Sequence, residues 1–285
     1  MSILVKIAKL YVRLVFRDNE YNALKTQKEF NVPDPPRAMA KRCEKLDHIE
    51  IRGFWIDKAN SGRGVLVYLH GGAFYFGPVK EHWDYIARIA KQTGMAAIMV
   101  DYGLAPQEPF PKGLDQIVEL VTTVGLPDRW HFLGDSSGAA MALAACFRLR
   151  RKEIPLPAKM VLMSPWVDLH LENREIPAVA PSDPMMTVER LANAARDYLG
   201  AADPYDPYYS PMFGDLTGLP PMLIQTGTAD LLWPDCKKFY QKCLNEGVDA
   251  TYEEYPDAFH DFMMLSILPE ARAALRSQTA FLTGN

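Results

Sequence analysis

The sequence of 285 residues is 48% hydrophobic and 23% charged, which is the composition of an ordinary globular protein with one large domain or two smaller ones. Its 31 lysines and arginines against 35 aspartates and glutamates leave a formal net charge of −4, so a nucleic-acid partner is not expected. The cysteines (Cys43, Cys146, Cys236 and Cys243) form no C-x-x-C pair and accompany no histidine cluster, so we expect no metal site and no disulfide framework, but reduced thiols of a cytoplasmic protein.

The N-terminal stretch, residues 1–18, alternates apolar and basic side chains at helical spacing. Lysines and arginines interrupt it, so it lacks the unbroken apolar core of a secretory signal, and no stretch is long enough to span a membrane. Ile3, Ile7, Leu10 and Leu14, with Tyr11 beside them, would form one apolar stripe of a helix. We expect this stripe to pack on the rest of the protein. The alternative, a basic amphipathic helix that rests on a membrane surface, is less favoured.

From about residue 47 the chain alternates strand-like and helix-like segments. Strands are predicted over residues 48–56, 64–70, 95–102, 129–134, 158–165, 220–227 and 250–256. Helices are predicted over residues 81–94, 114–125, 137–152 and 236–247, with a last helix from Pro269. Strands joined through helices indicate a parallel sheet covered on both faces. Residues 166–215 break the rhythm with many prolines, which favours one sheet with an inserted segment over two domains in series.

The segment Gly134-Asp135-Ser136-Ser137-Gly138 matches the pattern G-x-S-x-G. Only Ser136 has a glycine two positions away on each side, which makes it the candidate nucleophile. A sharp, strained turn from strand to helix would hold its hydroxyl above the sheet. Such pentapeptides also occur by chance as ordinary turns, so the prediction depends on the strand before it and the alanine-rich helix after it. The backbone N–H of Ser137 would then face a developing oxyanion.

A glycine loop, residues 68–77 (YLHGGAFYFG), follows another apolar strand. Adjacent glycines expose backbone N–H groups and let the main chain approach a ligand closely. An acyl-transfer enzyme needs two or three such donors where negative charge develops. The alternative is a glycine turn that serves chain geometry only. His70, which opens the loop, is more readily interpreted as a structural hydrogen-bonding residue than as a catalytic one.

A serine nucleophile needs a base and a carboxylate that orients the base. His260 comes just after a late strand, and Asp230 comes just after the strand before it. The chain order Ser136, Asp230, His260 is the one expected when all three lie on loops at strand ends. Asp257 and Asp261 are nearer to His260 in sequence, but sequence adjacency does not position a triad.

The other histidines are less suitable as a base. His48 and His131 fall in predicted strands, His170 in the inserted segment, and His82 at a helix start that it would cap. Asp230 also has an ordinary interpretation, as a solvated loop residue or a helix cap.

Six blocks of the chain, in order, resemble one known family. They are HGGAFYFG, VDYGLAPQEPFP, GDSSGAAMALA, MSPWVDL, DPYYSPMFGDLTGLPPMLIQTGTADLL and YPDAFHDF. From about residue 60 to the C-terminus the chain resembles the hormone-sensitive-lipase-like branch of the α/β-hydrolases, the bacterial carboxylesterase type. The resemblance implies an α/β-hydrolase fold, which is a mostly parallel twisted sheet flanked by helices, with a helical cap. Residues 46–165 and 216–285 would form the catalytic domain, and residues 1–45 and 166–215 the cap.

The same resemblance implies roles for three side chains. Ser136 would be the nucleophile, His260 the base and Asp230 the residue that orients the base. It implies no metal and no organic cofactor. Similar proteins form dimers through the last strand and helix, so a homodimer is an expectation of the resemblance alone.

The oxyanion donors implied by the resemblance are the backbone N–H groups of Gly72, Ala73 and Ser137, with His70 and Gly71 supporting the loop. The family commonly has a third glycine where this chain has Ala73. Its N–H can still donate, but a methyl group would cost about 1 kcal/mol if the loop requires positive φ, and it would restrict bulky alcohol groups.

A second departure lies in the block that the family writes D-Y-R-L-A-P-E. This chain has Gly103 and Gln107 at the arginine and glutamate positions. The salt bridge of those residues must be absent or replaced, and Glu108 is the candidate replacement. We expect an effect on local rigidity and not on the reaction.

The function predicted from these features is hydrolysis of small-molecule carboxylic esters by a serine hydrolase through an acyl-enzyme. Short acyl chains are favoured, because a small cap and no long lipid-binding extension are expected. Candidate pocket residues are Phe74, Tyr75, Phe76, Trp166, Met185, Met186, Tyr208 and Phe213, each of which has core packing as its alternative. The competing functions are a deacetylase or amidase for a specific acetylated metabolite, and a non-catalytic small-molecule receptor on the same fold.

Overall fold

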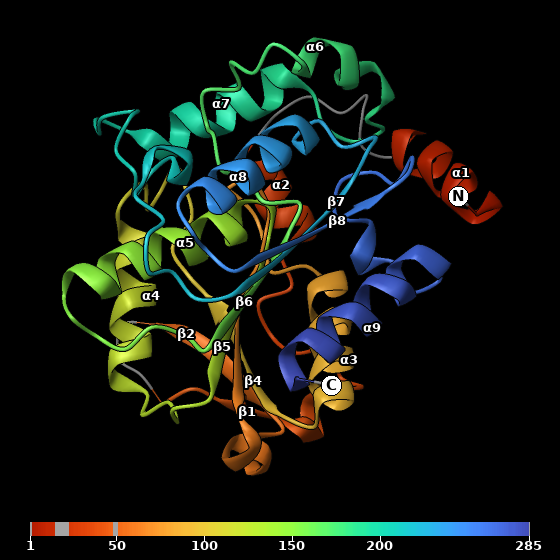
Figure 1. The fold of residues 1–285 in the computed structure, drawn as a ribbon. Coiled ribbons are helices and arrows are strands. Elements are labelled where there is room, and N and C mark those ends of the chain that lie inside the picture. The colour runs from red at the N-terminus through yellow and green to blue at the C-terminus, as the bar shows by residue number, and fades with distance from the viewer. Residues whose placement is uncertain (1, 15–22, 48–50, 285) are drawn as a thin grey trace.

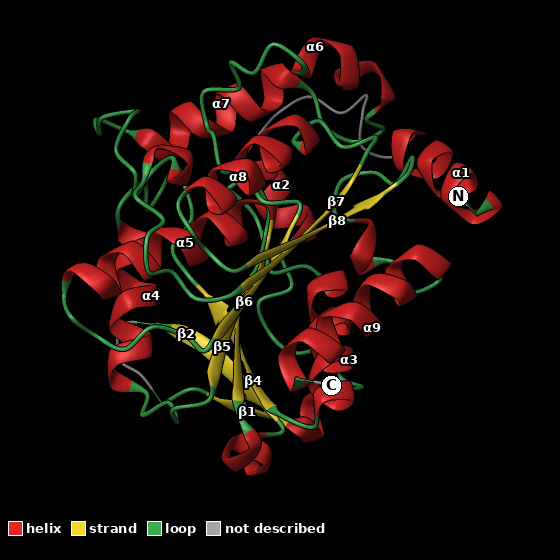
Figure 2. Cartoon of the chain, viewed as in Figure 1, coloured by secondary structure: helices red, strands yellow, loops and turns green. Residues whose placement is uncertain are grey.

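The computed structural model describes residues 2–14, 23–47 and 51–284. The start of the strand predicted from residue 48, including His48, and part of the predicted N-terminal cap lie outside these ranges. One eight-stranded sheet crosses the molecule (Figure 2). Its strands are β1 (Cys43–Lys45), β2 (Arg52–Ile56), β3 (Val65–Leu69), β4 (Ala96–Asp101), β5 (Trp130–Asp135), β6 (Lys159–Met163), β7 (Met222–Gly227) and β8 (Ala250–Tyr255).

The strand order across the sheet is β1-β2-β4-β3-β5-β6-β7-β8. The first three strands in this order pair antiparallel, and every pair from β4 onward is parallel. The predicted fold class, a mostly parallel sheet of the α/β-hydrolase type, is confirmed. Because parallel strands end at the same edge, the loops after β3, β5, β7 and β8 all leave the sheet on one side.

Helices cover both faces of the sheet. α4 (Lys112–Thr123), α5 (Ser136–Arg151) and α8 (Trp233–Asn245) contribute side chains to one buried cluster. α3 (Lys80–Thr93) and α9 (Pro269–Thr283) contribute to the other. Side chains alternate between the two faces of a strand, so in β3 Val67 belongs to the first cluster and Tyr68 to the second. Strands β3 to β7 are almost wholly buried, so the centre of the sheet is covered on both faces, as the alternation of strands and helices predicted.

Two further pieces stand apart from this alternation. α6 (Ile176–Val179) and α7 (Val188–Leu199) lie between β6 and β7 in the chain, and in Figure 1 they lie above α8 at the top of the molecule. Thr187 caps α7 by accepting a hydrogen bond from the Arg190 N–H. The N-terminal piece consists of α1 (Ile3–Val12) and α2 (Ala23–Phe30).

The packing predicted for the N-terminal helix is wrong. Ile3, Ile7, Leu10, Tyr11 and Leu14 are between 61% and 74% exposed. The side of α1 that packs on the protein carries Val5 and Val12, both buried. These two valines, seven residues apart, pack on the body of the molecule. The broader apolar stripe on the other side of the helix therefore faces away from it. No helix in the described part of the chain is long and apolar enough to cross a membrane.

Candidate active site

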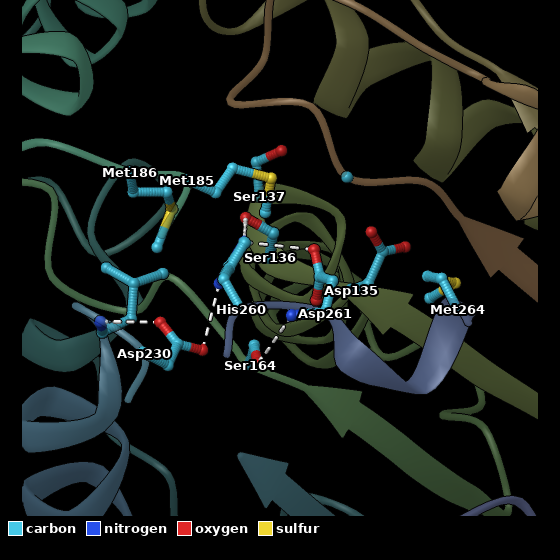
Figure 3. A network of polar contacts seen from close by, with 12 residues as sticks. Asp135, Ser136, Ser137, Ser164, Met185, Met186, Asp230, His260, Asp261 and Met264 are labelled. Atoms are coloured by element: carbon cyan, nitrogen blue, oxygen red, sulfur yellow. Dashed lines mark hydrogen bonds and ion pairs between the residues drawn. The ribbon is translucent and has the colours of Figure 1, made fainter. Parts of the chain in front are cut away.

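Three side chains from separate loops meet at the carboxyl edge of the sheet (Figure 3). Ser136 is the first residue of α5, directly after β5, whereas Asp230 follows β7 and His260 follows β8. His260 Nε2 lies 2.9 Å from Ser136 Oγ, and His260 Nδ1 lies 3.0 Å from Asp230 Oδ2. All three side chains are buried. With the proton of the neutral imidazole on Nδ1 and donated to Asp230, Nε2 is free to accept the Ser136 proton.

The turn that carries Ser136 is strained in the way the glycine pattern predicted. Ser136 has φ of 51°, in the left-handed region that residues with a Cβ seldom adopt. A Cβ at Gly138 would overlap the Leu69 carbonyl oxygen of β3, and a Cβ at Gly134 would come within 2.6 Å of the Gly138 carbonyl oxygen. Both glycines are therefore required for α5 to start this close to the sheet.

The imidazole of His260 has a third partner, which its place next to His260 in the sequence did not predict. Asp261 Oδ2 lies 3.1 Å from His260 Nε2, the same nitrogen that faces Ser136. Burial disfavours a charged imidazole, but the charges of Asp261 and Asp230 outweigh it and raise the pKa of His260 well above its ordinary value. Burial raises the pKa of Asp261 to about 7. The site therefore holds a proton more tightly than a His–Asp pair would by itself.

The inserted segment is tied to the Asp230 loop by Asp183, a buried residue that the sequence analysis did not single out. Asp183 Oδ1 accepts hydrogen bonds from the Met185 and Met186 N–H groups, each at 2.8 Å. Its other oxygen accepts from the Leu231 N–H, also at 2.8 Å, one residue after Asp230. Burial and the charge of Asp230 raise the pKa of Asp183 to about 6. The only sequence signal was an aspartate before Pro-Met-Met, which is typical of a local turn.

The glycine loop after β3 has three consecutive residues with positive φ. Gly72, Ala73 and Phe74 have φ of 120°, 52° and 64°. The loop therefore requires positive φ at Ala73, and alanine in place of the family's usual glycine costs about 1 kcal/mol there. In the described part of the chain the N–H groups of Gly72, Ala73 and Ser137 donate no hydrogen bond. The Phe74 N–H donates to Ser137 Oγ at 3.3 Å, which joins the loop to the start of α5.

A buried polar cluster lies beneath this loop. The Tyr68 hydroxyl donates to Asp135 Oδ1 at 2.5 Å, and His82 Nε2 lies 3.3 Å from Asp135 Oδ2. Burial opposes charge on both partners, but their attraction outweighs it, so the pKa of His82 is raised and the pKa of Asp135 is lowered. A Cβ at Gly71 would overlap the Asp135 carboxylate, so the loop is packed directly on the His82–Asp135 pair. Asp135, the residue immediately before the candidate nucleophile, thus links β3, α3 and the glycine loop.

The two histidines of this region have the roles that their positions indicated. His82 Nδ1 accepts a hydrogen bond from the Val79 N–H and caps α3. His70 stacks on Tyr102 with ring centroids 4.5 Å apart, and its Nδ1 lies 2.8 Å from the Gly71 carbonyl oxygen. Burial, reinforced by nearby His82, lowers the pKa of His70 to about 3, so this ring is neutral and Nδ1 donates. His70 is thus bonded to the loop that it opens.

Of the candidate pocket residues, the aromatic ones nearest the nucleophile are fully covered. The backbone N–H of Trp166 donates to the Ser136 carbonyl oxygen at 3.1 Å, and the Trp166 side chain is buried. Phe74 stacks face to face on Tyr198 with centroids 3.8 Å apart and lies 5.6 Å from Trp166. The remaining candidates near the site are less covered: Tyr75, Phe76 and Met185 are half-buried and Met186 is buried.

Two candidate pocket residues lie elsewhere, which corrects the prediction. Tyr208 lies under Arg148, whose guanidinium is 5.1 Å from the ring centroid, near the far end of α5. Arg148 follows Ser136 by twelve helical positions, about 18 Å along the axis. Phe213 packs edge-on against His170 in the inserted segment and is 43% exposed. Aromatic residues of this segment pack against each other and against α5, which the sequence could not separate from lining a pocket.

Among the described residues, the departure at Gly103 and Gln107 is accommodated without an ion pair of Glu108. The Gly103 N–H donates to Gln116 Oε1 at 2.6 Å, and Gln107 exchanges hydrogen bonds with Gln27 of α2. Arg52 of β2 lies 3.5 Å from Asp101, supplying a cation to this region. A polar cavity of about 390 Å³ remains here, lined by these residues and others. The proposed replacement through Glu108 is therefore not what the structure contains.

The cysteines are free thiols, and one of them, Cys236, lies within electrostatic range of Asp230. Of Cys43, Cys146, Cys236 and Cys243, all but Cys43 are buried. Within the described ranges no group of three or more histidine, cysteine, aspartate or glutamate side chains is arranged to hold a metal ion.

The chain is similar to known proteins in sequence and in fold. Residues 66–264 match the family described as having the alpha/beta hydrolase fold. The chain is 35% identical over 233 residues to an acetyl-hydrolase of Streptomyces hygroscopicus, which covers 80% of this chain and 78% of that protein. It is 34% identical over 239 residues to an esterase of Acinetobacter venetianus, and this match covers 82% of this chain and 79% of that protein. The crystal structure of an esterase from the bacterial hormone-sensitive lipase family superposes with a TM-score of 0.90 at 28% identity, covering 100% of this chain and 98% of that one.

Proposed function

This chain belongs to the α/β-hydrolase family, in its bacterial branch related to hormone-sensitive lipase, and from that premise we propose that Ser136, His260 and Asp230 form its catalytic triad. The enzyme is a carboxylesterase, and its substrates are small-molecule esters. The observation that carries the assignment is the unbroken chain of contacts from Ser136 Oγ through both imidazole nitrogens to Asp230, at 2.9 Å and 3.0 Å.

The reaction follows from these contacts. His260 Nε2 takes the proton from Ser136 Oγ as that oxygen attacks the acyl carbon, and Asp230 stabilises the imidazolium that forms. The backbone N–H groups of Gly72, Ala73 and Ser137 hold the oxyanion of the tetrahedral intermediate, each contributing about 3 kcal/mol to lowering the barrier. The imidazolium returns its proton to the leaving alcohol, and water then repeats the sequence on the acyl-enzyme.

The acyl group is short. Phe74 and Trp166 are buried, with rings 5.6 Å apart, and their backbone N–H groups bond Ser137 Oγ and the Ser136 carbonyl oxygen, which supports a shallow acyl site. A relative named as an acetyl-hydrolase supports the same preference. With p-nitrophenyl esters, kcat/KM should be highest for acetate or butyrate and fall steadily toward palmitate. A profile that rises with chain length would contradict the proposal.

The direct test compares the two adjacent serines. Ser136→Ala should reduce hydrolysis of p-nitrophenyl acetate to background and abolish labelling by a fluorophosphonate probe. Ser137→Ala is the matched control, because its hydroxyl bonds the Phe74 N–H and the Tyr102 side chain, and its own backbone donor remains. That variant should still be labelled. Turnover by Ser136→Ala, or labelling lost equally in both variants, would remove the assignment.

The same label separates the enzyme from a non-catalytic receptor, which would have no working base. The acetyl-hydrolase relative keeps one further candidate open, deacetylation of a specific metabolite. A panel of acetyl esters and matched acetamides distinguishes the two, since an ester hydrolase will cleave the esters at far higher kcat/KM.

We also propose that residues 1–45 and 166–215 form a cap over the site and that the chain forms a homodimer. The cap is supported by Asp183, which bonds the inserted segment to the Asp230 loop, and by Asn31 Oδ1, which accepts from the Gly77 N–H at 2.7 Å.

The dimer is supported by β8, which pairs with β7 along one edge and ends the sheet along the other. Sedimentation velocity tests the dimer.

A further inference from the structure

The N-terminal helix presents an apolar surface to solvent. Large hydrophobic side chains that are at least 36% exposed number twelve in the described part of the chain, and six of them lie between residues 3 and 14. They are Ile3, Leu4, Ile7, Leu10, Tyr11 and Leu14, which we call the α1 stripe. Scattered single exposed residues are normal on a soluble protein, but a contiguous group marks an interaction site.

The helix is held firmly in this orientation. Ser2 caps α1, since its hydroxyl accepts the Val5 N–H at 3.4 Å. The backbone N–H and hydroxyl of Ser2 donate to the two carboxylate oxygens of Glu270, at 2.6 Å and 2.8 Å, which fixes the start of α1 to the start of α9. Val5 and Val12 belong to the buried cluster on the opposite side. The exposure of the α1 stripe is therefore imposed by contacts and is not the result of an unattached helix.

The charges around the α1 stripe have one sign. Lys6, Lys9 and Arg13 are the charged residues between Ile3 and Leu14, and no acidic residue occurs there. At 3.6 residues per turn these cations fall between the buried valines and the stripe, along one flank of it. The whole chain has a formal net charge of −4, so this cationic helix stands out from an acidic protein.

An apolar face with a cationic flank is the pattern of a helix that lies in the interface of an anionic bilayer. Headgroups of negative charge complement the three cations while the stripe enters the acyl boundary. A second copy of the same face would complement the apolar stripe but would offer no counter-charge. The geometry also suits a planar surface, because α1 lies at the periphery of the molecule beyond the ends of β7 and β8 (Figure 1).

We propose that α1 docks this enzyme on the surface of an anionic lipid bilayer through the α1 stripe, with Lys6, Lys9 and Arg13 at headgroup level. The inference does not depend on the proposed triad, because it concerns binding and not turnover.

The experiment is flotation of the full chain with vesicles of phosphatidylglycerol and phosphatidylcholine in about equal parts, compared with vesicles of phosphatidylcholine alone. The wild type should float with the anionic vesicles, and its partition coefficient should fall when salt rises from about 0.1 to about 1 M. Ile7→Ser/Leu10→Ser should lower the coefficient about 100-fold, since two large side chains lose their burial in lipid. Lys6→Gln/Lys9→Gln/Arg13→Gln should also lower it about 100-fold.

The matched control is Val188→Ser/Leu244→Ser, which removes two exposed apolar side chains of α7 and α8 and should float as the wild type does. Far-ultraviolet circular dichroism and thermal unfolding of each variant show whether the fold is retained, as exposed positions predict. Flotation of Ser136→Ala equal to that of the wild type keeps the binding result separate from the catalytic assignment.

Three outcomes would overturn the proposal. The first is a wild type that does not float with anionic vesicles, and the second is flotation that survives Ile7→Ser/Leu10→Ser. The third is a dimer that these two substitutions dissociate in sedimentation velocity, without any vesicle binding. That result would assign the α1 stripe to a second copy of the chain.

Discussion

Replacing Asp261 with asparagine removes one negative charge next to the proposed base while preserving side-chain size. Asp261 Oδ2 lies 3.1 Å from His260 Nε2, which also faces Ser136 Oγ at 2.9 Å. The backbone at Asp261 has φ of 53°, a left-handed conformation that asparagine adopts readily. The substitution therefore changes the electrostatics of His260 with little change of the loop.

The size of the effect follows from the distance. Two unit charges 3.1 Å apart attract by about 5 kcal/mol at an effective dielectric constant of about 20. Part of that attraction offsets the cost of burying the charges, and neighbouring charges shift a pKa by about 1–3 units in practice. A protonated His260 cannot accept the Ser136 proton, so kcat/KM falls as pH falls through the raised pKa of His260. Without the Asp261 charge this pKa is lower, and the acid limb should move down by about 1–2 pH units.

The assay is kcat/KM for p-nitrophenyl acetate from about pH 5 to 9, at constant ionic strength and at the isosbestic wavelength of nitrophenol. Asp257→Asn is the matched control. Asp257 is exposed, lies three residues before His260 and also has positive φ, 58°. Its acid limb should stay with that of the wild type. An acid limb that does not move in Asp261→Asn, or that moves equally in both variants, would refute the reasoning.

Three further substitutions test the surroundings of the site. His82→Gln removes the buried partner of Asp135 and should lower the free energy of unfolding by about 2 kcal/mol. The pKa of His82 is raised and that of Asp135 is lowered. In urea titrations the decrease in the free energy of unfolding should therefore be largest between about pH 4 and 6.5, and it should shrink as pH rises through the folded-state pKa of His82. Asp183→Asn removes one of the acceptors that hold the Asp230 loop, so steady-state kinetics should give kcat/KM about tenfold lower; an unchanged value would leave Asp183 a purely local residue. Gly138→Ala places a Cβ against a carbonyl oxygen of β3 and should lower the midpoint of thermal unfolding by about 10 °C in calorimetry, whereas an unchanged midpoint would contradict the close approach.

The sequence was sufficient to predict the candidate site residues where a local pattern implies a position in the sheet. Ser136, Asp230 and His260 each follow a strand whose apolar residues identified it. Parallel strands bring their carboxyl ends to one edge, so three loops distant in the chain were expected to meet there. The G-x-S-x-G pattern also predicted the sharp turn at Ser136. Gly138 is required in this turn because α5 lies so close to β3.

The sequence was not sufficient where a side chain has alternative partners. The periodicity of residues 3–14 identifies an apolar face but not what covers it, and the Val5 and Val12 side packs instead. Asp183 and the His82–Asp135 pair join residues far apart in the chain, which no spacing reveals. Asp261 was set aside because a neighbour in sequence has no reason to reach the imidazole, yet the turn after β8 folds its carboxylate onto Nε2.

The strand order has a consequence for how activity arises during synthesis. β5, with Ser136 after it, lies in the interior of the sheet, while β8, which precedes His260, is added at the edge, and the two side chains are 124 residues apart. A nascent chain that has emerged from the ribosome as far as α5 has a hydroxyl but no proton acceptor, so it is chemically inert. Reactivity toward a fluorophosphonate then appears only when the last parallel strand has docked, and the label becomes a measure of completed folding in a cell lysate.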